Sequence, residues 1–249
     1  MPTWLEAGLW GLLGGGALVI GALIAWFLRV PDVVVASVMA FGSGVLISAV
    51  AFDLMAEAAR TGGLAATALG FLGGALAYLA ANALLARRGA RHRKRSGDQQ
   101  PSESEQGGSG AAIAVGALLD GVPESVVLGV GLLGGGVVSL PVLAAVFISN
   151  IPEGLSSAAG MKRNGRSARY IFGVWTTIAV LSGLSALLGY VALGSAPPEA
   201  IAVITAVAAG AILTMIADTM IPEAFEKTHT WTGLITTVGF LVAFAVDRA

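Results

Sequence analysis

Cysteine, histidine and charge are all scarce in this sequence of 249 residues. There is no cysteine, which excludes disulfide frameworks, thiolate metal sites and thiol catalysis. The two histidines are His92 and His229, so we expect no metal or catalytic centre built from histidine. Charged residues make up 12% of the chain and hydrophobic residues 56%, whereas soluble domains carry about 25% charged residues. This composition indicates an integral membrane protein.

Long apolar runs fill most of the chain, and each is close to the ~20 residues that a helix needs to cross the hydrocarbon of a bilayer. Only helices and closed barrels satisfy their backbone hydrogen bonds in lipid, and these runs are too long for barrel strands. We therefore predict an all-α integral membrane protein with one transmembrane domain. The eight predicted membrane helices cover residues 4–27, 33–58, 62–86, 110–133, 139–160, 170–193, 201–224 and 231–246.

One segment, residues 87–109, differs in composition from the rest of the chain. It starts with a run of arginine and lysine and continues with serine, glutamine, glutamate and glycine, which predicts a disordered loop. Basic loops stay in the cytoplasm, so eight spans place both termini outside it. Twelve of the 14 basic residues then lie on the cytoplasmic side, and only Arg60 and Arg248 lie outside. Binding of anionic membrane lipid is a second interpretation of the basic run.

Acidic residues are the unusual feature of the predicted spans, which contain no lysine or arginine. A carboxylate inside a membrane helix is costly unless it is paired or hydrated, and marks a functional site. Acids without basic partners predict a pathway for protons or a bound cation. The seven acids inside spans are Asp53, Glu57, Asp120, Glu124, Glu153, Asp218 and Glu223.

The positions of these acids follow a pattern. Asp120 and Glu124 are four residues apart and share a helix face, as do Asp53 and Glu57. Spans four and five are expected to be antiparallel neighbours, with Asp120 and Glu153 both near the middle of the bilayer. Three of the glutamates directly follow a proline, which removes a helical hydrogen bond and frees a carbonyl oxygen. The three prolines are Pro123, Pro152 and Pro222.

Bent helices with convergent carboxylates favour a cation site. The alternative interpretation is that the prolines are ordinary kinks of membrane helices and the glutamates are protonated residues that only pack.

Three of these segments resemble motifs of the ZIP (Zrt/Irt-like) family of divalent metal transporters. They are SNIPEGL at 149–155 in span five, DGVPES at 120–125 in span four and IPEA at 221–224 in span seven. The resemblance implies a 3+2+3 inverted-repeat arrangement and an elevator-like movement of spans one, four, five and six against the others. It also implies a homodimer, a bacterial inner membrane and transport of a divalent metal into the cytoplasm.

The chain departs from the family pattern at three positions: Asp120 stands in place of a histidine, and Gly121 and Ala186 replace ligands of members that bind two metals. The resemblance therefore implies one metal site. Its expected ligands are Asp120, Glu124 and Glu153, assisted by Asn150 and Ser149.

Such oxygen ligands favour Mn²⁺ or Fe²⁺, and carboxylates also bind Zn²⁺. The remaining acids are expected to form a pathway, with Asp53 and Glu57 attracting cations at the outer end. Asp218 and Glu223 are expected to lead the cation to the cytoplasm.

Two other classes of protein remain as alternatives. A proton- or sodium-coupled carrier of another small solute would use the acids as a relay, but such carriers usually hold a basic residue in a span. An intramembrane aspartyl hydrolase needs two aspartates that share one proton, and it leaves the Pro-Glu repeats unexplained. We therefore expect a transporter rather than an enzyme, with no resident cofactor and no nucleic-acid partner.

Overall fold

The computed structural model describes residues 1–85, 87 and 109–248, and the side chains of 109–114 are not described. The predicted loop over 87–109 lies almost wholly outside the described residues. Every regular element in the described part is helical, which confirms the predicted all-α class. The α-helices are α1 (Thr3–Phe27), α2 (Asp32–Ala49), α3 (Ala56–Leu85), α4 (Ser109–Val130), α5 (Leu140–Arg163), α6 (Ala168–Leu193), α7 (Pro198–Met215), α8 (Ile221–Thr228) and α9 (Trp231–Arg248).

Among the elements whose bounds the structure describes, two are π-helical. One, η1 (Val50–Met55), joins α2 to α3, and the other, η4 (Ile216–Met220), joins α7 to α8. A single 3₁₀ turn, η3 (Leu133–Gly135), lies between α4 and α5. Such π segments inside longer helices occur frequently at functional sites.

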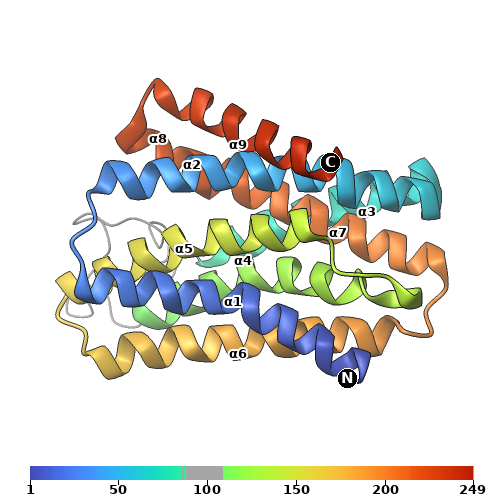
Figure 1. Ribbon diagram of the computed structural model, residues 1–249, viewed down its shortest axis with the longest axis horizontal. Helices are drawn as coiled ribbons and strands as arrows, with labels where there is room; N and C mark the ends of the chain where they lie inside the picture. The colour runs from blue at the N-terminus through green and yellow to red at the C-terminus, as the bar shows by residue number, and fades with distance from the viewer. Residues whose placement is uncertain (86, 88–108, 249) are drawn as a thin grey trace.

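Six helical stretches in the described part are long and apolar enough to cross a membrane, which fits a membrane protein. They are Thr3–Phe27, Asp32–Leu85, Leu140–Arg163, Ala168–Leu193, Pro198–Thr228 and Trp231–Arg248. The second stretch has 54 residues, and its direction changes at Gly63, whose φ of 75° and ψ of 165° are not helical. The chain turns back in this region at the right-hand end of Figure 1.

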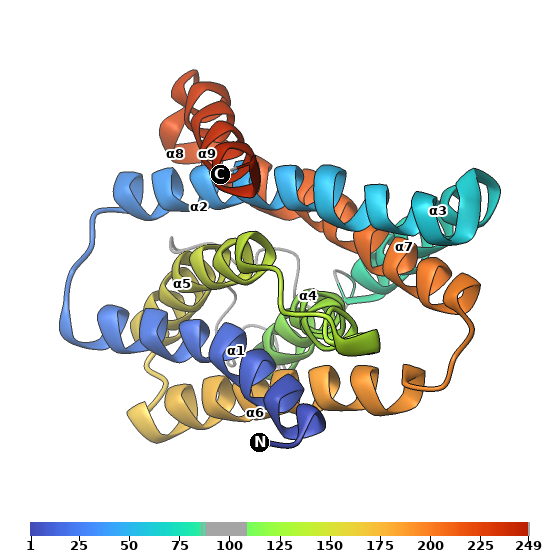
Figure 2. The ribbon, with the colours of Figure 1, turned by 45° about the vertical axis from the view of Figure 1, so that its right-hand side comes forward.

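The helices pack in two groups, which lie in the lower and upper parts of Figure 2. In the α1 group, which comprises α1, α4, α5 and α6, α1 packs against α5 and α6, and α4 packs against α6. In the α2 group, which comprises α2, α3, α7, α8 and α9 with η1 and η4, α3 packs against α7 and α2 against α9. The two groups meet mainly where α2 contacts α5 and where α4 contacts α7.

Glycine brings the helices within each group very close together. A Cβ at Gly154 of α5 would overlap a backbone carbonyl of α1, and a Cβ at Gly74 of α3 would overlap the carbonyl of Val207 in α7. The interface between the groups is looser at Gly42 of α2, where a Cβ would lie 3.2 Å from the Cα of Ser149 in α5. Packing therefore fixes each group internally more tightly than it joins the two groups.

Polar contacts sort the helix connections into two ends of the bundle. At one end the Lys162 ammonium donates to the carbonyl of Trp26 at 2.6 Å, and Lys227 pairs with Asp32 at 3.5 Å. At the other end, the junction of α2 with α3 meets the junction of α4 with α5, and Asp53 contacts Ser139 there. Connections that were predicted to share one membrane side thus lie together, and which end faces the cytoplasm stays a prediction.

Candidate functional site

Burial divides the seven acids into two sets. Asp120 and Glu124 of α4 are each 2% exposed, and Glu153 of α5 is 5% exposed, so the three predicted metal ligands are buried. All three belong to the α1 group. The four predicted pathway acids belong to the α2 group and are less buried: Asp53 and Glu223 are half-buried, and Glu57 and Asp218 are exposed.

The three buried acids do not form a described metal-binding group in this conformation, and the predicted ligand set stays a prediction. Among the residues that the structure describes, no three histidine, aspartate or glutamate side chains form a group that could hold a metal ion. The reason lies in the helix packing, because α4 packs mainly on α6 and α5 mainly on α1, and the two helices contact each other little. Close approach of Gly129 in α4 to the backbone of Ala186 in α6 holds this arrangement. In this conformation the three expected ligands are therefore buried, but together they do not form a group that could hold a metal ion.

Asp120 has a partner that the sequence analysis missed. The hydroxyl of Tyr78 in α3 donates a hydrogen bond to Oδ1 of Asp120 at 2.5 Å, and the Tyr78 side chain is 2% exposed. The bond joins the two helix groups. Tyr78 itself was the available signal in the sequence, because a buried phenol in an apolar span needs a polar partner. The sequence does not show which partner this is, because Asp120 lies 42 residues away.

The two predicted assisting ligands already make hydrogen bonds. Asn150 donates through Nδ2 to the carbonyl of Gly14 in α1 at 3.1 Å. Ser149 donates through Oγ to the carbonyl of Val146 in its own helix at 3.0 Å. Each bond uses a hydrogen of the side chain, so the amide oxygen and the hydroxyl oxygen retain lone pairs that a cation would bind.

The three predicted proline positions differ in their surroundings. Pro123 and Pro152 lie inside α4 and α5, and both helices continue past them. Pro222 instead lies in the first turn of α8, directly after η4. Asp218 is a member of η4, and Asp53 occupies the equivalent segment η1. The sequence analysis did not predict these π segments, because one extra residue in a turn leaves the apolar composition unchanged.

A cavity of about 790 Å³ lies where the junction of α2 and α3 meets the junction of α4 and α5. Both helix groups line it, and its polar lining includes Asp53, Glu57, Arg60 and Ser139. Asp53 accepts a hydrogen bond from the Ser139 hydroxyl at 3.1 Å. The same oxygen of Ser139 caps α5 by accepting from the backbone N–H of Val142 at 3.3 Å.

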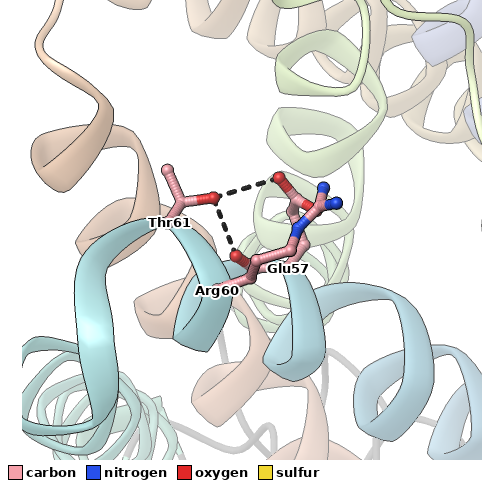
Figure 3. Close-up of polar contacts among 3 residues, drawn as sticks. All are labelled: Glu57, Arg60 and Thr61. Carbon is pink, nitrogen blue, oxygen red and sulfur yellow. Dashed lines mark hydrogen bonds and ion pairs between the residues drawn. The ribbon is translucent and has the colours of Figure 1, made fainter.

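Glu57 has a basic partner, contrary to our expectation for all seven acids. It forms an ion pair with Arg60, and it accepts a hydrogen bond from Oγ1 of Thr61 at 3.0 Å (Figure 3). Arg60 lies just after the predicted end of span two and reaches back over one helical turn to Glu57. Because Arg60 was counted outside the span, this pair was not expected. The other predicted pathway acids, Asp218 and Glu223, lie toward the opposite end, where Glu223 precedes Lys227 by one turn.

Comparison with known proteins does not assign the chain to a family. No protein-family model matches it, and no curated protein is significantly similar to it. The resemblance to ZIP transporters thus depends on the short motifs around Asp120, Glu153 and Glu223. The function has to be inferred from the residues of the site.

Proposed function

We propose that this protein carries a divalent metal cation across a membrane and into the cytoplasm, with Mn²⁺, Fe²⁺ and Zn²⁺ as candidates. The observation that carries the proposal is the burial of Asp120, Glu124 and Glu153 inside an apolar helix bundle. Buried carboxylates are costly unless a counter-charge or hydrogen bonds compensate them. A transported cation supplies that counter-charge, and oxygen ligands suit hard and intermediate divalent ions.

We further propose eight spans in a 3+2+3 inverted arrangement. Counted this way, spans one to three are α1, α2 with η1, and α3 after its turn. Spans six to eight are α6, α7 with η4 and α8, and α9. Packing supports this pairing, because α3 lies against α7 as α9 lies against α2. The π segments add support, since each follows an equivalent helix and carries one aspartate, Asp53 or Asp218.

The two helix groups are suited to an elevator-like movement. The buried acids lie in the α1 group, and the glycine contacts that lock helices together lie within the groups. Sliding of the α1 group against the α2 group would carry the acids across the membrane without disrupting either group. The approach of α4 to α5 that brings Asp120, Glu124 and Glu153 together is part of the proposed cycle.

The cavity supplies an entrance for the cation. It reaches Val127 and Leu128 of α4, about one helical turn beyond Glu124. We place this end outside the cytoplasm, because Lys162 and Lys227 lie at the other end and basic residues favour the cytoplasmic side. The cation would exchange hydration water for Asp53, then for the three buried carboxylates with Asn150 and Ser149, and would leave past Asp218 and Glu223.

Uptake of Mn²⁺, Fe²⁺ and Zn²⁺ by proteoliposomes tests the proposal. We expect Asp120→Ala and Glu153→Ala to lower the initial rate at least tenfold, because each removes an anionic ligand from the site. Glu226→Gln is the matched control, since it removes an acid outside the proposed pathway and should leave the rate near that of the parent. Parent-like uptake by Asp120→Ala would show that the site is assigned wrongly.

Among the described residues no three acids form a metal-binding group in this conformation, which favours a second candidate, a proton- or sodium-coupled carrier of another small solute. A relay of protons does not need three carboxylates to surround one ion. This candidate predicts that the parent takes up no divalent metal in the same vesicles. It also predicts that divalent metals do not compete with uptake of its solute.

A further inference from the structure

In the described part of the chain, hydrogen bonds from a hydroxyl to a carboxylate cross the interface between the helix groups at two places. Tyr78 of α3 donates to Asp120 of α4, and Ser139 at the start of α5 donates to Asp53 of η1. In both bonds the acceptor is an acid that the proposed function assigns to the cation. These two polar contacts between the groups are thus made by carboxylates that would bind the transported ion.

We propose that Tyr78 is a latch that couples cation binding to the movement of the α1 group. Its hydroxyl holds the cation-free Asp120 to the α2 group, and a cation that binds Asp120 displaces the hydroxyl and releases the interface. The inference rests on the proposed function and deepens it by naming the residue through which an occupied site is distinguished from an empty one.

The energetics of the bond favour such a role. A hydrogen bond to a carboxylate is about twice as strong as one between neutral groups, and both partners are only 2% exposed. Breaking the bond without a replacement would remove a charge-assisted hydrogen bond from a buried carboxylate, which is unfavourable. A bound cation provides the replacement. The α1 group is therefore held in place when Asp120 binds no cation, and it is released when Asp120 binds one.

The position of the bond explains why it cannot persist through the movement. Asp120 belongs to α4, which close contact at Gly129 fixes to α6, whereas Tyr78 belongs to α3, which Gly74 fixes to α7. Neither helix can follow the other when the groups slide. The hydrogen bond must break at that step. Its free energy therefore opposes movement of the cation-free protein.

A different role for Tyr78 makes the opposite prediction. A hydroxyl that stays on one oxygen of a ligating carboxylate orients it, and loss of such a partner typically weakens metal binding by about 10–100-fold. Loss of a latch instead strengthens binding, because the cation no longer competes with the hydroxyl and the binding-competent state is more populated. The sign of the change in affinity separates the two roles.

The absence of cysteine allows a clean test with spin labels on the full-length protein. One label replaces Leu64 of α3 and the other replaces Val137 before α5; the two residues are 79% and 83% exposed and lie in different groups. Distances between the labels are measured by double electron–electron resonance with and without Zn²⁺. Equilibrium Zn²⁺ binding is measured on the same variants, with Tyr190→Phe of α6 as the control tyrosine.

We expect Zn²⁺ to shift the distance distribution of the parent, and Tyr78→Phe to show the shifted distribution without Zn²⁺. We also expect Tyr78→Phe to bind Zn²⁺ severalfold more tightly, while Tyr190→Phe behaves like the parent. Asp120→Asn is a second variant, because it keeps an oxygen acceptor for Tyr78 but loses the anionic ligand. It should retain the metal-free distribution when Zn²⁺ is present.

Two results would overturn the latch alone, given a parent that binds Zn²⁺. One is an unchanged metal-free distribution in Tyr78→Phe together with tenfold weaker binding, and the other is a Zn²⁺-induced shift in Asp120→Asn. A parent that binds no divalent cation overturns the proposed function, and with it the release of the latch by a cation. The parent measurement thus separates failure of the function from failure of the latch.

Discussion

Three of the seven acids have partners from other parts of the chain or from the next helical turn. Asp120 is held by Tyr78, Asp53 by Ser139, and Glu57 by Arg60. The sequence was sufficient to find acids inside apolar helical runs, because both features are read directly from the residues. It was not sufficient to predict Tyr78 or Ser139 as partners, which are 42 and 86 residues away from the acids.

At the residue scale, Arg60 opposes the attraction of cations to the cavity. Its charge neutralises Glu57 on the cavity wall. We expect Arg60→Gln to lower the KM for divalent-metal uptake about two- to threefold at low ionic strength, the size typical of an exposed ion pair, and to do so less at high salt. Initial rates across metal concentrations check this, with Arg163→Gln at the opposite end as the control. A raised KM would show that Arg60 assists entry.

The elements show where hydropathy is informative and where it is not. The predicted spans 4–27 and 139–160 are close to α1 and α5, because long apolar runs between polar residues determine both ends. The same signal does not reveal the π segments η1 and η4, nor that α4 and α5 pack on different helices. The packing of α4 on α6 involves close contacts at glycines such as Gly129, which are made between segments distant in the sequence.

At the scale of elements, two adjacent glycines of α3 give a matched pair. A Cβ at Gly74 would overlap the carbonyl of Val207, whereas a Cβ at Gly73 would meet no atom within 4 Å. We expect Gly74→Ala to destabilise the protein by about 1–3 kcal/mol through overpacking of α3 against α7. Gly73→Ala should be neutral or stabilising by up to about 1 kcal/mol, because alanine favours the helix. Thermal unfolding in detergent distinguishes them, and equal effects would contradict the packing of α3 on α7.

The whole molecule combines two closely packed helix groups with a separation of charge. The formal net charge of −1 conceals this separation, because the buried acids lie in the α1 group while Lys162 and Lys227 lie at one end of the bundle. Composition alone is sufficient to indicate a membrane protein. The division into groups, the cavity between them and the weak contact of α4 with α5 require the tertiary structure.

The central claim is that Asp120, Glu124 and Glu153 together make one cation site once α4 and α5 approach each other. Equilibrium binding of Mn²⁺ to the purified protein in detergent tests it most directly. The account predicts close to one high-affinity Mn²⁺ per chain, lost in Asp120→Asn and in Glu153→Gln and retained in Glu226→Gln. A parent that binds no Mn²⁺, Fe²⁺ or Zn²⁺, or variants at Asp120 and Glu153 that bind as the parent does, would contradict it.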